Sequence, residues 1–546
     1  MIDEQSKWVY APYRRRRSGR MLRRVAGFAV VLVPIAALAV FAVLLTTSKP
    51  ELEASATALA QIKLPLGGGT VQRVEAVVGP HAQSVPVRLQ GDDVWPVEKL
   101  AVGEKVTVFA TIARPGWNSW LTGKTQQVRL TVTTPSAALS STFLSRHGSQ
   151  PLTLHFTEPV RTIAYGPLGS RPAMHTLAAP ASSISLTEHA TAGTVVVAGA
   201  VRTWESPKRV AVSWFPAGAK ASAVATPAPG TTIKPGTRIT LTFSKPVDKV
   251  LGSSRPPVSP ITPGTWHQEG SHTISFIPTG YGYGLGAHVQ VALPAGVLLV
   301  GGQHSGSDAV GAWSVPAGTT LRLQQLLANL GYLPVNFRQD GSVASTIGAQ
   351  EAAAMSPPKG SFGWRYPNTP AGLQAHWAAG SYGELTKGAV MAFENDQGLT
   401  ADGIAGPAVW KALISATLSN RASNFGYTYV AVSEGSPESI DVWHNGKSVV
   451  TGPVNTGIPQ APTALGTYAV YEHIPVGTMS GTNPDGSTYN DPGIPWISYF
   501  NGGDALHGFT RASYGFPQSL GCVEMPASEA GQVYPYTPIG TIVQVS

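Results

Sequence analysis

Two segments of the chain repeat one alternating pattern of residues. Residues 151–160 read PLTLHFTEPV, and residues 238–247 read RITLTFSKPV. Apolar and polar residues alternate in both segments up to a proline, which predicts a half-buried β-strand that ends there. The spacing of roughly 80–90 residues is the size of a small β-sandwich. The chain is therefore expected to fold into successive β-domains.

The composition supports this interpretation over most of the chain. Charged residues make up only 12%, while there are 60 glycines and 45 prolines. Few charges and many turn residues are typical of β-rich domains outside the cytoplasm. Strand-like runs at 105–112 and 127–133 extend the β pattern toward the N-terminus. We predict three β-sandwich units, at 51–135, 136–220 and 221–300, and expect them to act as spacers.

The N-terminal segment predicts how the chain is placed at a membrane. Residues 1–24 are rich in arginine, and residues 25–45 contain no charge. A run of this length can cross a bilayer as a helix, and a basic flank favours the cytoplasmic side. We therefore expect a cytoplasmic tail at 1–24, a transmembrane helix at 25–46 and a catalytic part outside the plasma membrane. A cleaved signal peptide, with a site at 54–56 (ASA), is the alternative.

The charge of the chain follows from the same segment. The formal net charge is +8, and most of it lies in the first 24 residues. The remaining chain has no basic face, so we expect no nucleic-acid partner.

Residues 318–416 show helical periodicity in three places. The first helix covers a group of leucines near residue 323. A second helix fits 384–395, and Pro407 opens a third at the first helical position, which proline favours. Between the first two helices, 338–380 is rich in Pro, Gly and Ala and predicts an insertion. The first helix is marked by leucines at i, i+3, i+4 and i+7, followed by a stop at Gly331: Leu323, Leu326, Leu327 and Leu330.

The last part of the chain, 424–546, returns to short alternating strands. Asn445-Gly446 is a strong hairpin signal between two of them. Residues 475–495 consist mostly of turn-forming and polar residues, which predicts a long loop that lies over a substrate as a lid. Tyr489 and Trp496, at the far end of this loop, are candidate substrate-binding residues.

Cys522 is the only cysteine of the chain, so it cannot form an internal disulfide. It lies in 519–523 (SLGCV), shortly after His507. A thiolate is a strong nucleophile, and a neighbouring histidine can take up the proton of the thiol and stabilise its charge. The pair predicts thiol catalysis with a lowered pKa at Cys522. The alternative is that Cys522 is a small buried apolar side chain.

These residues carry a resemblance to a known family. A His-Gly pair at 507–508, a spacer and 519–523 (SLGCV) resemble the signature of the L,D-transpeptidase catalytic domain, the YkuD family. Residues 454–457 (VNTG) also fit it. The resemblance implies a β-rich L,D-transpeptidase catalytic domain over 424–546.

Other parts of the chain resemble modules that accompany such domains. The strings LQQLLANLGYLP, TKGAVMAF and GLTADGIAGPAVW resemble the peptidoglycan-binding domain type 1 over 318–416. The second and third β units resemble bacterial immunoglobulin-like modules. With its apolar segment, the whole chain resembles an actinobacterial, membrane-anchored L,D-transpeptidase: a multidomain, mainly β protein with one small helical domain.

The resemblance assigns roles to residues of the motif. Cys522 is the nucleophile, and His507 is its general base, oriented by the backbone carbonyl of Gly508. The N–H groups of Gly521 and Cys522 form the oxyanion hole. Ser519 shapes the turn and is expected to contact the substrate.

Two positions depart from the family pattern. Family members often have His where this chain has Leu520, and often Arg or Asn where it has Glu524. Leu520 cannot donate a hydrogen bond, and Glu524 replaces a donor with an acceptor.

The resemblance implies a two-step acyl transfer. The thiolate attacks the L-to-D peptide bond after the third residue of a peptidoglycan tetrapeptide stem and releases D-alanine. A side-chain amine of a second stem then resolves the thioester and forms a 3→3 cross-link. The expected partners are donor and acceptor stem peptides, the cell wall and the membrane; no metal or other cofactor is expected. Two alternatives remain: an L,D-carboxypeptidase-type hydrolase, and a non-catalytic cell-wall-binding scaffold.

Overall fold

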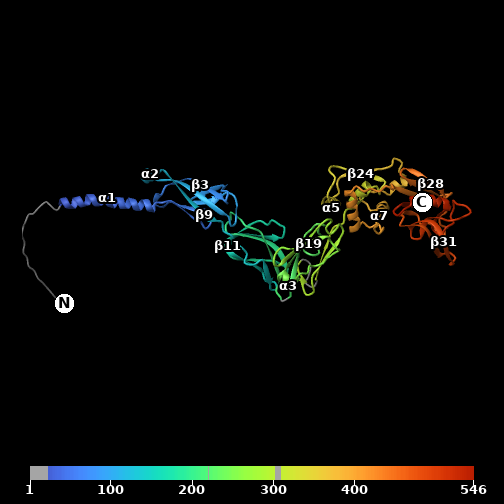
Figure 1. Cartoon of the computed structure of the whole chain (residues 1–546), viewed down its shortest axis with the longest axis horizontal. Helices are drawn as coiled ribbons and strands as arrows, with labels where there is room; N and C mark the ends of the chain where they lie inside the picture. The colour runs from blue at the N-terminus through green and yellow to red at the C-terminus, as the bar shows by residue number, and fades with distance from the viewer. Residues whose placement is uncertain (1–21, 219, 302–308) are drawn as a thin grey trace, which may run out of the picture. The chain divides into compact units, whose positions relative to one another are not determined.

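The computed structural model describes residues 22–218, 220–301 and 309–546, with side chains from residue 35 onward. The chain divides into two compact units, and Figure 1 shows the order of their elements. One unit takes in the described residues up to Leu144, together with Gln150–Glu188 and Thr194–Ser213. The other takes in Ser145–Ser149, His189–Gly193 and the described residues from Trp214 to Ser546.

Helix α1 (Leu22–Thr47) covers the segment for which a membrane span was predicted. None of the helices in the described part of the chain is both long and apolar enough to cross a bilayer. The prediction of a transmembrane helix at 25–46 is therefore not supported. Residues 1–21 of the predicted cytoplasmic tail lie outside the described residues.

Residues 51–133 form two four-stranded sheets, β1-β2-β6-β5 and β4-β3-β8-β9, around one core. Strand β8 shows how the sequence builds it, because Val106, Val108, Ala110 and Ile112 are fully buried and alternate with residues that are more exposed. The elements are β1 (Glu51–Glu53), β2 (Ala60–Lys63), η1 (Pro65–Gly67), β3 (Thr70–Val78), β4 (Gln83–Val85), β5 (Val87–Gln90), β6 (Asp93–Pro96), β7 (Leu100–Ala101), β8 (Lys105–Ala113), α2 (Gly116–Thr122) and β9 (Thr125–Thr133).

The next strands form one five-stranded sheet, β10-β15-β13-β11-β12, and a short parallel pair, β14-β7. A full second sheet, which the predicted sandwich at 136–220 requires, is not seen among the described residues. The strands are β10 (Phe143–Arg146), β11 (Leu152–Pro167), β12 (His175–Leu186), β13 (Gly193–Ala200), β14 (Glu205–Ser206) and β15 (Val210–Pro216).

Strand β11 corrects the prediction that the first repeat ends at its proline. The strand continues through Pro159, and its register with β12 shifts between His155 and Val160. A bulge of this kind leaves a residue outside the hydrogen-bond ladder, so a proline without an N–H is tolerated there. The second repeat behaves as predicted, because β17 (Ile239–Phe243) ends before Pro246.

Residues 222–314 form a two-sheet sandwich around a core that includes Phe243 and Trp313. Its sheets are β19-β20-β17-β16-β22 and β18-β21-β23, so it extends past the predicted end at residue 300. The remaining elements are β16 (Ser222–Thr226), α3 (Val247–Val250), β18 (Val258–Ser259), β19 (Gly264–Gln268), β20 (Thr273–Pro278), β21 (His288–Ala292), β22 (Leu298–Leu299) and β23 (Val310–Ser314).

The helical region packs its three predicted helices around one core that includes Leu327, Phe393 and Trp410. The predicted insertion at 338–380 is itself ordered into two helices and a strand, which pairs with the strand that leads into the insertion. The elements are α4 (Thr320–Asn329), β24 (Val335–Gln339), α5 (Ile347–Met355), β25 (Gly360–Trp364), α6 (Ala371–Ala375), α7 (Glu384–Asp396) and α8 (Pro407–Leu418).

The C-terminal region consists of two sheets, β28-β27-β26-β34-β29 and β30-β31-β32-β33, which share one core. Val430, Val442 and Val543 from the first sheet pack with Leu506 and Val523 from the second. The elements are β26 (Thr428–Ser433), β27 (Ser439–His444), β28 (Lys447–Pro453), β29 (Gly466–Ala469), β30 (Glu472–Thr482), β31 (Thr488–Asn501), β32 (Asp504–Gly508), β33 (Val523–Met525), α9 (Ala527–Val533), η2 (Tyr534–Tyr536) and β34 (Ile542–Val545).

The prediction of a long loop at 475–495 is wrong. β30 and β31 pair as an antiparallel hairpin from Glu472↔Tyr499 to Thr482↔Thr488. Backbone pairing satisfies the N–H and C=O groups of this polar segment without an apolar pattern in its side chains.

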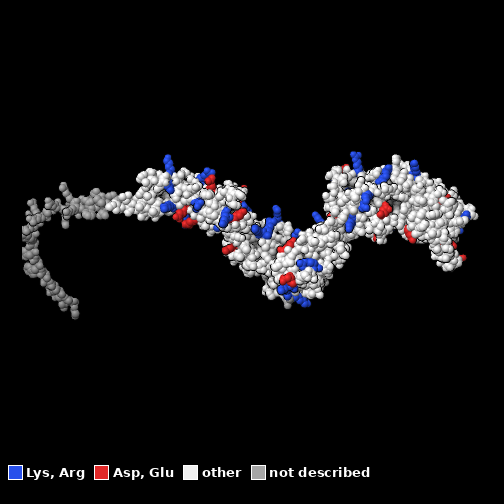
Figure 2. Space-filling model, in the orientation of Figure 1, with Lys and Arg blue, Asp and Glu red and all other residues white. Residues whose placement is uncertain are grey.

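Charged side chains are scattered over the described surface shown in Figure 2, and that face carries no continuous basic patch. This agrees with the low charge content of the sequence.

The helical region and the C-terminal region meet closely at two glycines. Helix α7 carries Gly388, where an added Cβ would lie 2.5 Å from the backbone oxygen of Gly540 and 2.8 Å from Ile542 Cδ1. Apolar residues of α6, α7 and four strands of the C-terminal sheet form a shared cluster around this contact. Backbone therefore approaches backbone here, and a side chain would separate the two regions.

This contact predicts opposite effects for two helical glycines. Gly388→Ala should lower the free energy of unfolding by about 1–3 kcal/mol, because the new methyl group overpacks the interface. Gly348→Ala, near the start of α5, is the matched control. A Cβ there meets nothing within 4 Å, so alanine should stabilise by up to about 1 kcal/mol. Denaturant titration of both variants measures the difference, and equal effects would contradict the close approach at Gly388.

Candidate active site

Two parallel strands bring His507 and Cys522 to one face of a sheet. His507 lies in β32 and pairs in register with Glu524 of β33. Cys522 lies in the turn directly before β33, on the same side of the sheet as Glu524 and His507. All three line one cavity of about 680 Å³. The structure thus brings together the two residues on which the predicted chemistry depends.

The cavity is enclosed by the β30–β31 hairpin, by β32 and by the segment that leads to β33. Tyr489 of β31, a predicted substrate-binding residue, lines it. Trp496 does not line it: its ring lies 5.2 Å from that of Tyr534. Ser519 is buried beneath the turn, and its hydroxyl donates to the carbonyl of Cys522. It therefore shapes the turn, and neither Ser519 nor Trp496 is among the residues that line this cavity.

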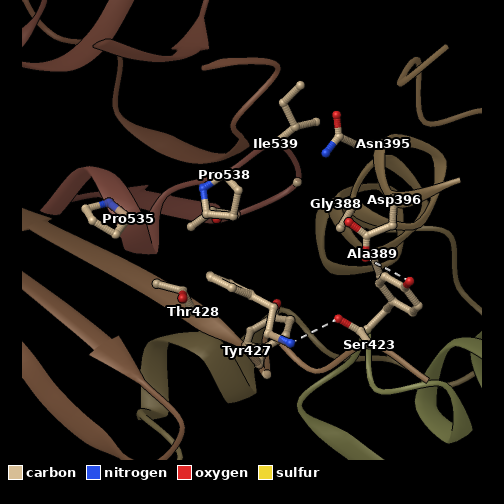
Figure 3. A pocket seen from close by; sticks show the side chains of 16 residues that line it. Gly388, Ala389, Asn395, Asp396, Ser423, Tyr427, Thr428, Pro535, Pro538 and Ile539 are labelled. Atoms are coloured by element: carbon tan, nitrogen blue, oxygen red, sulfur yellow. Dashed lines mark hydrogen bonds between the residues drawn. The ribbon is translucent and has the colours of Figure 1, made fainter. Parts of the chain in front are cut away.

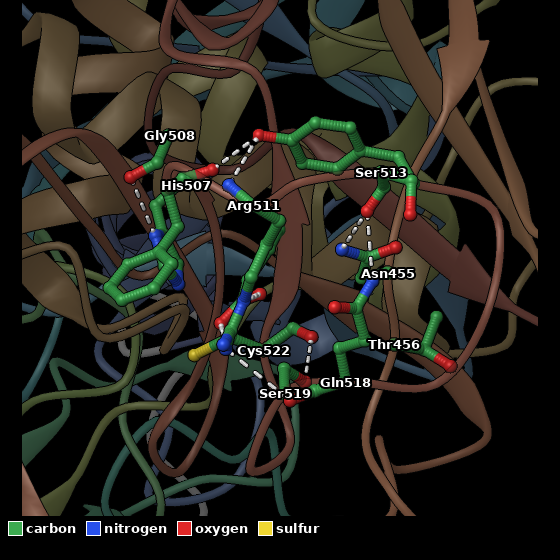
Figure 4. A network of polar contacts seen from close by, with 12 residues as sticks. Asn455, Thr456, His507, Gly508, Arg511, Ser513, Gln518, Ser519 and Cys522 are labelled. Atoms are coloured by element: carbon green, nitrogen blue, oxygen red, sulfur yellow. Dashed lines mark hydrogen bonds and ion pairs between the residues drawn. The ribbon is translucent and has the colours of Figure 1, made fainter.

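His507 is held as a neutral base. It is only 2% exposed, and its Nδ1 lies 3.1 Å from the carbonyl oxygen of Gly508, to which it donates (Figure 4). Nε2 is then the ring nitrogen with a free lone pair. Burial lowers the pKa of His507 below its ordinary value, although the Gly508 carbonyl and the Glu524 carboxylate oppose this shift. A neutral imidazole can accept a proton.

The thiol of Cys522 contradicts the expectation of a lowered pKa. The pKa of Cys522 is raised to about 12, mainly by burial and also by the nearby carboxylates of Asp504 and Glu524, while a hydrogen bond from the Ala505 N–H lowers it. The sulfur lies 3.6 Å from the carbonyl oxygen of Gly503, to which the thiol donates. A neutral His507 supplies no positive charge to offset these effects. The resting pair is therefore a thiol beside an imidazole, and the proton must move during attack.

The predicted oxyanion hole is only partly available in this state. The N–H of Gly521 donates to Ser519 Oγ at 3.2 Å. Gly521 has φ +113°, and a Cβ there would lie 2.5 Å from Asp504 Oδ1. Glycine is thus required at this position both by its backbone conformation and by the close carboxylate.

Glu524, one of the two departures from the family pattern, is bound by an arginine that the sequence did not single out. Arg511 Nε lies 2.7 Å from Glu524 Oε2, and its Nη2 lies 2.8 Å from Oε1 (Figure 4). The guanidinium also donates to the carbonyl of Gln518 at 3.3 Å and lies over the ring of Phe509. This pair ties the segment after β32 to β33 and holds the turn that carries Leu520, which lines the cavity.

A second cavity, of about 290 Å³, lies between α7 and the C-terminal region (Figure 3). Its walls include Asp396, whose carboxylate accepts a hydrogen bond from Tyr332 at 2.9 Å. Cys522 and His507 do not line it, so thiol chemistry belongs to the first cavity.

Comparison with known proteins identifies two parts of the chain. Residues 428–545 match the L,D-transpeptidase catalytic domain, and residues 371–413 match the putative peptidoglycan-binding domain. The chain is thus a multidomain, mostly β protein with a C-terminal L,D-transpeptidase catalytic domain and a peptidoglycan-binding domain. The second match begins at α6, so it leaves out α4, which had been predicted as the first half of that domain. No curated protein matches the sequence.

Solved structures of L,D-transpeptidases are similar to parts of the chain. The catalytic domain from E. faecium L,D-transpeptidase is 24% identical and covers 23% of this chain and 100% of its own, with a TM-score of 0.21. An L,D-transpeptidase from Mycobacterium smegmatis is 11% identical and covers 60% of this chain and 100% of its own, with a TM-score of 0.20. An L,D-transpeptidase from Mycobacterium tuberculosis H37Rv is 12% identical and covers 59% of this chain and 96% of its own, with a TM-score of 0.19.

The raised thiol pKa predicts slow alkylation. Iodoacetamide should modify Cys522 at pH 7 more slowly than an ordinary thiol with a pKa near 8.5, and the rate should still be rising at about pH 10. The unfolded protein is the control, because the same thiol is then exposed to water. A rate that levels off below about pH 8 would show a preformed thiolate–imidazolium pair instead.

Proposed function

We propose that this chain is an L,D-transpeptidase that forms 3→3 cross-links in peptidoglycan through a thioester on Cys522. The observation that carries the proposal is the placement of His507 on β32 and of Cys522 directly before the neighbouring parallel strand β33, both facing one cavity. The matched catalytic domain supports the reaction class. The matched peptidoglycan-binding domain supports a substrate in the cell wall, and the proposal therefore includes a reaction outside the cytoplasm.

The first half-reaction forms the thioester. Nε2 of His507 takes the proton of Cys522 as the sulfur attacks the carbonyl after the third residue of a donor stem. The tetrahedral oxyanion is stabilised by backbone N–H groups at the turn, and the N–H of Gly521 becomes available when it leaves Ser519 Oγ. The C–N bond then breaks, and the departing D-alanine receives its proton from His507.

The second half-reaction returns the thiol. The side-chain amine of an acceptor stem attacks the thioester carbonyl, a C–N bond forms and the C–S bond breaks. A proton released from the attacking nitrogen passes through His507 to the sulfur. Both steps need only a base that is neutral at rest, and burial keeps His507 in that form.

Product analysis tests the proposal. A soluble disaccharide-tetrapeptide incubated with the protein should give free D-alanine, an adduct on Cys522 and a 3→3 linked dimer, all detected by mass spectrometry. Cys522→Ala should remove all three products, because the attacking sulfur is absent. Tripeptide alone would indicate the carboxypeptidase-type hydrolase, and no adduct at all would indicate the wall-binding scaffold.

The position of Leu520 provides a control within the turn. Leu520 lines the cavity but has no polar atom in its side chain, so Leu520→Ala should keep the adduct on Cys522 under conditions where the protein stays folded. An inactive wild type that Leu520→His makes active would show instead that the chain is a decayed enzyme.

A further inference from the structure

The charges around the catalytic cavity are unbalanced in a way that the first half-reaction does not explain. Three carboxylates line the cavity, those of Asp491, Asp504 and Glu524, against a single cation, Arg511. The guanidinium of Arg511 is bound in a two-point ion pair by Glu524. None of the ion pairs among the described residues includes Asp504. Its carboxylate is thus left without a cation beside the nucleophile.

Asp504 has one oxygen that is used by the fold and one that is not. Oδ2 accepts hydrogen bonds from the Ala464 N–H at 3.2 Å and from Asn501 Nδ2 at 3.3 Å. Oδ1 lies against Gly521, where an added Cβ would be 2.5 Å away, and it accepts no hydrogen bond within the described part of the chain. Oδ2 therefore fixes the side chain, while Oδ1 is directed at the backbone next to Cys522.

This placement is unfavourable for forming a thiolate. A carboxylate beside a thiol opposes its ionisation, and Asp504 contributes to the raised pKa of Cys522. The carboxylate therefore hinders the attack of sulfur on the donor. The position of Asp504 is explained if its carboxylate binds a cationic group. That group arrives after the thioester has formed, when the sulfur carries no charge.

We propose that Asp504 binds the amino group of the acceptor in the second half-reaction and so favours an amine over water. The inference rests on the proposed function, and the ligand is a primary alkylammonium group on a stem peptide. A side-chain amine of this kind has a pKa of about 10.4, so it arrives protonated. Oδ1 of Asp504 pairs with this ammonium group next to the acyl group on Cys522. The positive charge of Arg511 does not compete for Asp504, because it is already paired with Glu524.

The proton balance of the step is complete. The bound ammonium gives one proton to water and becomes the attacking amine. After the C–N bond forms, the nitrogen loses a second proton to His507, which delivers it to the sulfur as the C–S bond breaks. Asp504 stays ionised throughout and acts by binding, so its removal should spare the acylation of Cys522.

Asp504→Asn separates this role from the rest of the reaction. With a tetrapeptide donor alone, the variant should acylate Cys522 at least as fast as the wild type, because one carboxylate that opposes the thiolate is gone. With a diamino-acid acceptor added, the ratio of cross-linked product to hydrolysed product should fall by about tenfold or more, as expected for the loss of a charge-assisted contact. The KM for the acceptor should rise, while the KM for the donor stays the same.

Asp491→Asn is the matched control, because it removes a carboxylate from the same cavity but from β31. It should leave the product ratio unchanged. A wild-type ratio in Asp504→Asn would overturn the inference, and so would an equal fall in Asp491→Asn. A wild type that forms no adduct on Cys522 would instead overturn the proposed function itself.

A measurement on the wild type covers the case in which Asp504→Asn does not fold. An N-trimethylated analogue of the acceptor keeps the charge but cannot attack. It should inhibit cross-linking in competition with the acceptor and leave the rate of acylation unchanged. A neutral analogue with hydroxyl in place of the amine should inhibit at least about tenfold more weakly, and equal inhibition by the two would overturn the inference.

Discussion

The parallel pairing of β32 with β33 is the constraint on which the active site depends. It sets His507 opposite Glu524, and the alternation of side chains then places Cys522 on the same face. A shift of one residue in this register would turn Cys522 toward the core and away from His507. Leu506 and Val523 make such a shift unfavourable. Both are buried in the core between the two sheets, and the shift would remove Val523 from it.

The ion pair between Arg511 and Glu524 extends this constraint to the connecting segment. A parallel pair needs a crossover between its strands, and here the crossover carries both the arginine and the turn before Cys522. The side chain of Glu524 is 6% exposed and that of Arg511 is 30% exposed. Removal of one partner would leave a largely buried charge without compensation. Glu524, which departs from the family pattern, is thus held by an ion pair with Arg511.

The sequence predicted those features that local pattern encodes. The alternation in 238–247 gave a strand that ends before its proline, and the heptad-like leucines at 323–330 gave helix α4. The motif around Cys522 singled out Cys522 and His507, which line one cavity in the structure, because both lie in short strings with a recognisable spacing. Strand β11 was cut short in the prediction because a bulge at Pro159 depends on pairing with β12. The β30–β31 hairpin was missed because its polar side chains give no apolar alternation.

Properties that depend on distant residues could not be read from the motif. Asp504 and Arg511 lie near His507 in sequence, but their relation to Cys522 follows only from the pairing of β32 and β33. The same relation reverses the expected shift in the pKa of Cys522, because burial and two carboxylates raise it and the neutral imidazole of His507 supplies no opposing charge. The account therefore requires proton transfer from Cys522 to His507 during attack.

The rate of acylation of Cys522 as a function of pH, in single turnovers with a tetrapeptide donor, tests this requirement most directly. The rate should fall only as the pH drops below about 6.5, because His507 accepts a proton only while it is neutral and its pKa is lowered. His507→Gln should lose this dependence and react about a hundredfold or more slowly. An unchanged rate in His507→Gln, or a fall that already begins above about pH 7.5, would contradict the account.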